Sequence, residues 1–280
     1  MSTSPDDLRL TTLAASLADQ AVGHTIYHHD SVESTMPLAH KLAPTARSGT
    51  IILADEQTQG RGRLARRWDA PPGLGLLLSV LIKPPHLPPM PAQLPMIGGL
   101  AVINALESAW PATLGHLWLK WPNDLLLDGG KVGGLLIESA LMGSQMSHAV
   151  LGMGINVHQQ PAHLPPVPDH RPQPTSLAIF GERIGKASPS RAELLLAFCL
   201  ALGDLLGPNA PSAVDLHRLW QGRLITLGQI VTVWPTTAGD SFTGTALATS
   251  LTGELILRDP TGAEQTFAAG DVTTGSQSGA

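Results

Sequence analysis

The sequence predicts an α+β fold in which a mixed sheet flanked by helices is followed by a small β-barrel. Apolar runs of strand length outnumber helical segments, and several strands follow one another across tight turns. The last ~50 residues contain only short β-rich runs separated by glycine-containing turns. These three observations favour hairpins and a mixed sheet over a regular alternation of strands and helices.

The first half of the chain supplies most of the expected elements. A short amphipathic helix is predicted by the spacing of Leu10, Leu13, Ala14, Leu17 and Ala18. Strands are predicted at Thr50–Ala54, Leu74–Ile82, His116–Trp121, Leu125–Leu127, Val132–Glu138 and Ala149–Val157. A helix is expected at Ala92–Trp110, and the turn 128–130 (Asp-Gly-Gly) predicts a hairpin.

Two proline clusters interrupt this pattern. Six prolines fall within Pro84–Pro95 and six more within Pro161–Pro174. Proline lacks a backbone N–H and cannot lie inside a sheet. We therefore expect both clusters to be surface loops without catalytic residues.

The second half of the chain closes the larger domain and begins a small one. Ser190 and Glu193 have the spacing of a capping box before an apolar helix, Leu194–Leu206, and Leu216–Trp220 predicts a further helix. Strands follow at Ile230–Trp234, Phe242–Ala248, Leu255–Arg258 and Gln265–Phe267. We place the larger domain at residues 1–221 and the β domain at residues 222–280.

Composition excludes several classes of protein. The 280 residues carry a net charge of -5, and no apolar run is long enough to cross a membrane. The acidic N-terminus does not have the pattern of an export signal, so we expect a cytoplasmic protein with no membrane partner. The single cysteine, Cys199, lies in an apolar run and is expected in the core. The histidines lack metal-site spacing, so no protein-bound metal is predicted.

Basic residues are concentrated in one segment. Arg61, Arg63, Arg66 and Arg67 place four of the 17 basic residues within seven positions. DNA demands a broad basic face, which this chain lacks, so the cluster favours a small phosphorylated ligand. A solvated basic turn is the alternative.

Known nucleotide-binding motifs do not fit this segment. It matches G-x-G-x-x-[GA] formally, but Pro71 and Pro72 exclude a long helix, and Lys83 stands near the position of the expected acidic residue. The lysine that follows Gly129 and Gly130 has neither the earlier glycine nor the Ser or Thr of a Walker loop. Any nucleotide site is therefore of another type.

Three further motifs place polar groups at strand ends. Lys120–Asp124 (KWPND) holds a lysine and an amide on a turn between two strands. Lys131–Glu138 (KVGGLLIE) places a lysine before paired glycines, which allow a ligand to approach the backbone closely. Gly152–Val157 (GMGINV) ends a strand with an asparagine suited to a base edge or an amide.

Four motifs resemble those of the biotin protein ligases in their order and spacing. They are the arginine segment GRGRLARRW, then KWPND, KVGGLLIE and GMGINV. Asp30–Thr35 resembles the biotin-contacting entry segment of that family, and the tail from Gly222 resembles its SH3-like domain. The resemblance covers residues 25–272. It implies a catalytic fold like that of class II aminoacyl-tRNA synthetases and other biotin and lipoate ligases, of the monofunctional type without an N-terminal DNA-binding domain.

The resemblance implies a two-step ligation. Biotin and MgATP give biotinyl-5'-AMP and pyrophosphate, and a lysine of a biotin carboxyl carrier protein then attacks the mixed anhydride. The residues agree with this chemistry, because Arg61, Arg63 and Lys131 are suited to hold a carboxylate against a phosphate. The resemblance also makes a homodimer plausible.

The roles of single residues follow from the same resemblance. The biotin contacts are expected from Ser34, Thr35, Gln57, Gly60, Arg61 and Lys131. The nucleotide contacts are expected from Arg63, Trp68, Asn123, Lys131, Gly152, Gly154 and Asn156. Catalysis is assigned to Arg63, Lys131 and Asp124, with Asp124 near the magnesium carried by ATP or steering the incoming lysine.

Simpler explanations exist for some of these residues. Ser34 and Thr35 could cap a helix. Trp68 and Trp121 could be core aromatics. Lys120 could be a solvated charge.

The chain also departs twice from the family pattern. Met36 stands where the family usually has Asn, which bears on the pocket entrance. Ala65 stands where it usually has Gly, which bears on how tightly the arginine segment turns.

Three rival functions fit the residues less well. A lipoate ligase or octanoyltransferase would not need the polar groups of Ser34, Thr35 and Gln57. A biotin-dependent repressor would need an N-terminal winged helix, but only 33 residues precede Ser34, so no DNA binding is expected. A non-catalytic biotin-binding protein would not need both Arg63 and Lys131.

Overall fold

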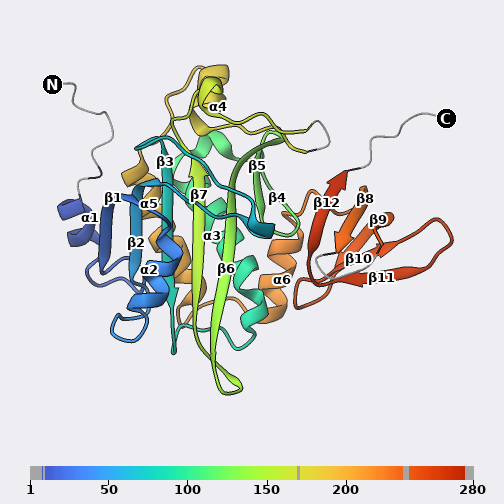
Figure 1. The fold of residues 1–280 in the computed structure, drawn as a ribbon, viewed down its shortest axis with the longest axis horizontal. Coiled ribbons are helices and arrows are strands. Elements are labelled where there is room, and N and C mark those ends of the chain that lie inside the picture. Colours follow the sequence, from blue (N-terminus) through green and yellow to red (C-terminus); the bar gives the residue numbers. More distant parts are fainter. Residues whose placement is uncertain (1–7, 9, 169–170, 236–239, 275–280) are drawn as a thin grey trace.

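The computed structural model contains two sheets, one in the body of the molecule and one at its C-terminal end (Figure 1). It describes residue 8 and residues 10–168, 171–235 and 240–274. Among these residues no helix is both long and apolar enough to cross a membrane.

The larger sheet has seven strands in the order β1-β2-β3-β7-β6-β5-β4. Only β1 and β2 run parallel, and each of the other neighbouring pairs is antiparallel. The strands are β1 (Ile26–Val32), β2 (Ile51–Gln57), β3 (Gly75–Ile82), β4 (Leu117–Lys120), β5 (Asp124–Leu127), β6 (Gly130–Met142) and β7 (Gln145–Asn156). The predicted mixed sheet is confirmed.

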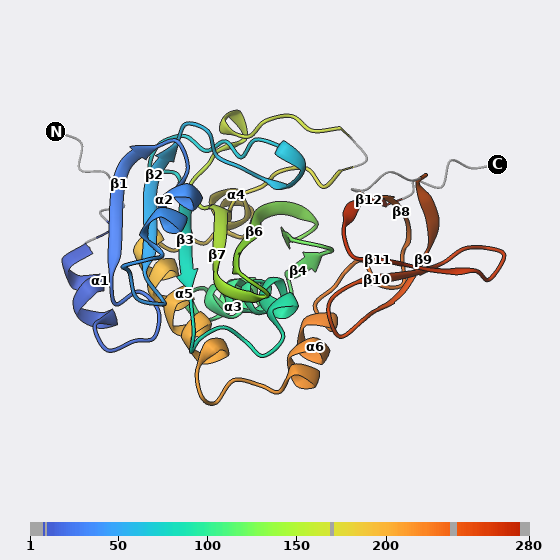
Figure 2. The same ribbon diagram turned by 60° about the horizontal axis from the view of Figure 1, so that its bottom comes forward.

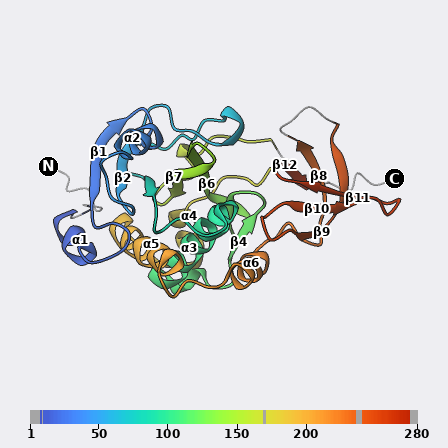
Figure 3. The same ribbon diagram turned by 90° about the horizontal axis from the view of Figure 1, so that it is seen from below.

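Helices cover both faces of this sheet (Figure 3). On one face, α3 (Leu94–Ala109) and α5 (Arg191–Leu206) share one core with Ile51 and Leu53 of β2. On the other, α2 (Thr35–Leu42) packs on Ile52. Side chains alternate between the faces of a strand, so β2 supplies both cores. Every residue of the central strand β3 is buried for the same reason.

The smaller sheet follows α6 (Ala213–Gln221), and its five strands are all antiparallel, consistent with an SH3-like domain. Its strands are β8 (Ile230–Pro235), β9 (Phe242–Thr249), β10 (Leu255–Arg258), β11 (Glu264–Phe267) and β12 (Gly270–Thr274). The strand β12 forms the edge nearest the larger sheet (Figure 2). The domain division after residue 221 stays a prediction.

The predicted strands and helices are present with shifted ends. The capping box is confirmed, because the Ser190 hydroxyl accepts from Glu193 N–H while the Glu193 carboxylate accepts from Ser190 N–H. Asp128 and Gly129 have the positive φ values of a hairpin turn. Cys199 is in the core, where burial raises the pKa of its thiol to about 12.

Four strands and α-helices were not among the predicted elements, namely β1, α2, β12 and α4 (Leu177–Ile184), although the alternative for Ser34 and Thr35 implied a helix at α2. The first and third are edge strands that are too polar to form apolar runs. The second begins at Thr35 and contains Pro37 in its first turn, where proline is tolerated. The fourth has only eight residues.

Candidate functional site

A pocket opens on the larger sheet and is closed on one side by β12. Its walls come from the start of α2, the arginine segment between β2 and β3, the turn between β4 and β5, the start of β6, the end of β7 and the segments 164–167 and 171–174. It gathers nearly all the predicted site residues, namely Ser34, Thr35, Gln57, Arg61, Arg63, Trp68, Asn123, Asp124, Lys131, Gly152, Gly154 and Asn156.

Gly60 is not among the residues that line the pocket. Its carbonyl accepts the Trp68 N–H (2.9 Å), which closes the base of the arginine segment. Of the predicted site residues, Gly60 alone is outside the described pocket wall, so its contribution here is to the shape of the loop.

One end of the pocket carries a network of polar side chains. Thr35 donates both its N–H (2.9 Å) and its hydroxyl (3.2 Å) to Gln57 Oε1. The Thr35 hydroxyl lies 2.7 Å from that of Ser79, which is fully buried on β3. Ser34 occupies the N-cap position of α2 without a side-chain capping bond. The hydroxyls therefore serve the pocket wall rather than the helix.

The floor is built from the glycines of β7. A Cβ on Gly154 would lie 2.7 Å from the indole of Trp68, and a Cβ on Gly152 would lie 2.9 Å from Met36 Sδ. Met36 is 3% exposed and packs with Val150 and Leu136. The family's usual Asn position therefore holds an apolar side chain that fills space beside the floor.

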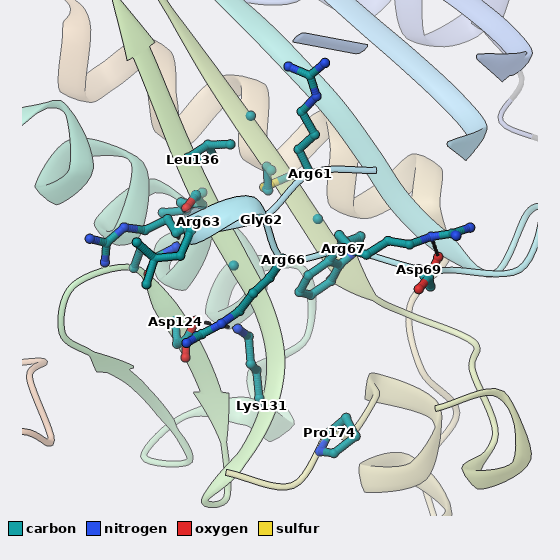
Figure 4. Close-up of a pocket in the computed structure, with 18 of the residues that line it drawn as sticks. Arg61, Gly62, Arg63, Arg66, Arg67, Asp69, Asp124, Lys131, Leu136 and Pro174 are labelled. Carbon is teal, nitrogen blue, oxygen red and sulfur yellow. Dashed lines mark hydrogen bonds and ion pairs between the residues drawn. The ribbon is translucent and has the colours of Figure 1, made fainter. Parts of the chain in front are cut away.

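The arginine segment is a narrow loop. Arg61 and Arg67 form an isolated antiparallel bridge, and Gly62 N–H donates to the Arg66 carbonyl (2.7 Å). Leu64 takes the positive φ of 57° at the tip, next to Ala65. Figure 4 shows Arg66 extended toward Asp124 and Lys131, whereas Arg61 points away from them.

Lys131 and Asp124 form the charged centre of the pocket. Lys131 Nζ lies 2.5 Å from Asp124 Oδ1 and 5.7 Å from the centre of the Trp68 ring. Beside them, Asn123 Nδ2 donates to the Leu135 carbonyl (2.6 Å), which fixes the turn between β4 and β5 against β6. A carboxylate and an ammonium group are thus held together over an aromatic face.

At the far end, Asn156 is held by two hydrogen bonds. Its Nδ2 donates to the Thr175 carbonyl (2.9 Å), and its Oδ1 accepts from Gln159 Nε2 (3.2 Å). Thr175 N–H donates to the Lys131 carbonyl (2.9 Å), so one backbone segment ties Asn156 to Lys131.

The C-terminal sheet contributes an anionic edge to the pocket. Asp271 binds Arg66 through two hydrogen bonds, one of 3.1 Å, and Arg171 through a third of 3.3 Å. Burial acts to raise the pKa of Asp271, but the hydrogen bond and charge of Arg66, together with Arg171, outweigh it and lower that pKa. The Asp271 hydrogen bond also raises the pKa of Arg66.

Two more cations contact the same strand through its backbone. Arg63 Nη1 donates to the Gly270 carbonyl (3.3 Å), and Lys120 Nζ donates to the Val272 carbonyl (2.6 Å). Lys120 is only 8% exposed, so the alternative of a solvated charge is wrong. Burial lowers the pKa of both Lys120 and Arg63, which Asp124 and Asp271 partly oppose.

Sequence reasoning missed part of this site. The cluster Pro161–Pro174 was expected to be a surface loop without catalytic residues, but its described part lines the pocket with Leu164, Pro165, Val167, Arg171, Pro172 and Pro174. Asp271 and Gln159 also escaped notice. Arg171, the one arginine in the proline cluster, was the sequence feature that could have indicated that this segment faces the pocket. Trp121 is 1% exposed, which confirms the core alternative for that residue, although it also borders the pocket.

Asp124 also fits a magnesium ion brought by a nucleotide. Mg²⁺ is commonly bound through one or two carboxylates together with substrate phosphates, and Asp124 offers such a carboxylate in the pocket wall. Elsewhere, His28, Asp30 and Asp55 lie close enough to share a cation. However, Asp55 is already paired with His28 (3.0 Å) and Arg191 (2.7 Å), and this cluster does not line the pocket.

Comparison with known proteins finds ligases of biotin and lipoate. The sequence model of the Biotin/lipoate A/B protein ligase family matches residues 29–156. The chain is 33% identical to a biotin--[acetyl-CoA-carboxylase] ligase of Paracoccus denitrificans, covering 87% of this chain and 98% of that protein. It is 30% identical to the bifunctional ligase/repressor BirA of Bacillus subtilis, covering 95% of this chain and 79% of that protein.

Solved structures show the same architecture. The biotin protein ligase from Aquifex aeolicus in complex with biotin and ATP has a TM-score of 0.68 at 27% identity, covering 89% of this chain and 97% of that one. The biotin protein ligase from Leishmania major in complex with biotinyl-5-AMP, at 24% identity and a TM-score of 0.63, shares the fold over 88% of this chain and 99% of that one.

Proposed function

The chain belongs to the biotin protein ligases, enzymes that form a carbon–nitrogen bond, and from this premise we propose that it makes biotinyl-5'-AMP and transfers the biotinyl group to a lysine of a biotin carboxyl carrier protein. Biotin and ATP are its substrates. The observation that carries the proposal is a single pocket with a polar end at Thr35 and Gln57 and a cationic centre at Lys131.

The polar end suits the ureido ring of biotin. A cyclic urea presents one carbonyl acceptor and two N–H donors, and it demands fixed partners when it is buried. Gln57 Oε1 already accepts from Thr35, which fixes the carboxamide with Nε2 on its other side. Ser34 and Thr35 add hydroxyl groups. A fatty-acyl pocket would require none of these groups, so they favour biotin over lipoate or octanoate.

The cationic centre suits the first step of the reaction. A biotin carboxylate oxygen forms a bond to the α-phosphorus, the bond from that phosphorus to the oxygen bridging the β-phosphate breaks, and pyrophosphate leaves with the electron pair. Both reactants are anions, so cations must lie beside them. We assign this task to Lys131 and Arg63, with Trp68 and Asn156 beside the base, whereas Arg61, which points away from Lys131, is assigned to biotin binding alone.

The second step needs an exposed acyl carbon and little more. The neutral lysine amine of the carrier attacks that carbon, a C–N bond forms, the C–O bond to AMP breaks, and the amine proton passes to solvent. Asp124 lies beside Lys131, where a carboxylate can attract an incoming lysine. Magnesium bound to the nucleotide would neutralise phosphate charge, and Asp124 would hold it on the protein side.

Biotin-dependent ATP–pyrophosphate exchange tests the first step. We expect exchange with biotin and none with lipoate or octanoate at equal concentration. Lys131→Ala is expected to lower exchange by about 100-fold or more, since removing one donor to the developing charge commonly costs 10²–10³ in rate. Lys186→Ala, an exposed lysine outside the pocket, is the matched control. Exchange with lipoate instead of biotin would move the assignment to the lipoate ligases.

The second step is tested with a purified biotin carboxyl carrier domain. We expect mass spectrometry to find one biotinylated lysine, and replacing that lysine by arginine should abolish labelling. Labelling at many lysines would contradict transfer to a specific carrier. The homodimer and the cytoplasmic location stay predictions.

A further inference from the structure

The proposed function gives no role to one fully buried side-chain carboxamide next to the pocket, that of Gln159. Gln159 is 0% exposed and does not line the pocket. Its Nε2 donates to Asn156, whereas its Oε1 has no partner among the described residues. A buried polar atom without a partner costs stability, so its presence calls for an explanation.

The hydrogen bonds fix the direction in which Asn156 faces. A backbone carbonyl can only accept, so the Asn156 atom 2.9 Å from the Thr175 oxygen is Nδ2. Oδ1 then faces Gln159, which must present its amino group. Turning the Asn156 carboxamide over would place oxygen against the Thr175 oxygen and NH₂ against the Gln159 NH₂. Both new contacts would be repulsive.

What remains of the Asn156 carboxamide is one donor and one acceptor. The protein uses one of its two hydrogens and one of its two lone pairs. A donor next to an acceptor complements adenine, which presents its amino group beside a ring nitrogen acceptor. In hypoxanthine an oxygen replaces that amino group, so the fixed Oδ1 would face another acceptor. A carboxamide free to turn over could adapt to either base.

We propose that Gln159 is a positioning residue that holds the Asn156 carboxamide in the orientation that accepts ATP and rejects a 6-oxopurine triphosphate. The inference rests on the proposed function, because it requires the base to lie beside Asn156. The backbone of Gln159 is itself well anchored, since its main-chain carbonyl accepts from the buried Ser176 hydroxyl (2.6 Å). Its amide also packs on Gly75, where a Cβ would lie 3.2 Å from Nε2.

Gln159→Met tests the role of the amide with little change in side-chain length. Exchange kinetics are measured with ATP and with ITP, and biotin affinity is measured separately. We expect the ATP/ITP ratio of kcat/KM to fall by about 10-fold, because half of the orienting contacts are lost and a paired base contact is worth one to two orders of magnitude. The KM for ATP should rise, whereas biotin affinity and kcat with ATP should change less than about twofold.

Two further variants complete the test. Gln160→Met is the matched control, since the neighbouring amide is outside the pocket and donates to Glu182 on the surface (2.9 Å). Gly75→Ala keeps the glutamine but places a Cβ 3.2 Å from both its Nε2 and the Ile155 carbonyl, which displaces the amide by a few tenths of an ångström, so it should shift the ATP/ITP ratio in the same direction by a smaller factor. Gly75→Ala also tests the inference if the Gln159→Met protein does not fold.

The outcomes separate this inference from the proposed function. Wild-type protein that uses ITP as efficiently as ATP would overturn the inference. So would folded Gln159→Met with an unchanged ratio, or with equal losses for both nucleotides, which a purely structural role would produce. Absence of biotin-dependent exchange with ATP in the wild type would instead overturn the proposed function.

Discussion

Gly154 gives the sharpest test of the pocket floor. It lies on β7 between β3 and β6, opposite Leu77 and Gly134. A Cβ at this position would stand 2.7 Å from two atoms of the Trp68 indole and 3.1 Å from a third. Ordinary carbon contacts are about 3.5–4.0 Å, so in Gly154→Ala the ring must move by about 1 Å.

The size of the effect follows from that displacement. Overpacking of this kind costs about 1–3 kcal/mol. If the ring bears on bound nucleotide, the loss appears in kcat/KM for ATP as a decrease of about 5- to 150-fold, because 1.4 kcal/mol is a factor of ten. Stability should fall less, since Trp68 lines an open pocket and can move into it.

The assay is ATP–pyrophosphate exchange in a double-mutant cycle. Gly154→Ala is compared in the wild type and in Trp68→Ala, where the obstructing ring is absent. We expect the cost of the alanine to disappear in the Trp68→Ala background. An equal cost in both backgrounds would refute the reasoning, because the clash with the ring would not be its cause.

Three other predictions concern selectivity, pH and stability. Arg63→Gly should release the adenylate and label nearby lysines indiscriminately, and unchanged carrier selectivity would contradict its role over the phosphate. Asp271→Asn should lower the free energy of unfolding by about 1 kcal/mol, a modest value because its partner Arg66 is 41% exposed. The folded pKa of Asp271 lies below its ordinary value of 3.8, so this contribution is present above pH 3.8 and is lost as the pH falls through the folded value. Denaturation of both proteins from pH 7 to pH 2 should show the difference closing at the acid end. Gly203→Ala, inside α5 with only a loose contact to Ala21, should raise the melting temperature by about 2–4 °C, as calorimetry would show.

Strands and helices were predicted correctly where the sequence of the element itself contains an apolar run or a capping motif. The continuous apolar run of β3 and the capping box before α5 are examples. Two edge strands, β1 and β12, are too polar to leave such a pattern, whereas the other two, β4 and β11, were predicted. Thus β1 and β12 were missed, and with β12 the anionic wall of the pocket was missed as well.

The segments that line the pocket were predictable for a similar local reason. An anion site needs glycine for close approach and arginine or lysine for charge, and both requirements are met within nine residues of the arginine segment. The proline cluster was judged by its unsuitability for a sheet. Unsuitability for a sheet says nothing about whether a loop lines a pocket, which the segments 164–167 and 171–174 do.

By itself, then, the sequence predicted the fold class, the family and twelve of the residues that line the pocket, because each prediction depends on residue types at short spacing. Only the tertiary structure decided how those residues are held. Arg66 meets Asp271 across 205 residues, Lys120 is buried against Val272, and Asn156 is held by the Thr175 carbonyl across 19 residues. Such contacts depend on how distant segments pack, and no local pattern encodes the partner of a charge or an amide.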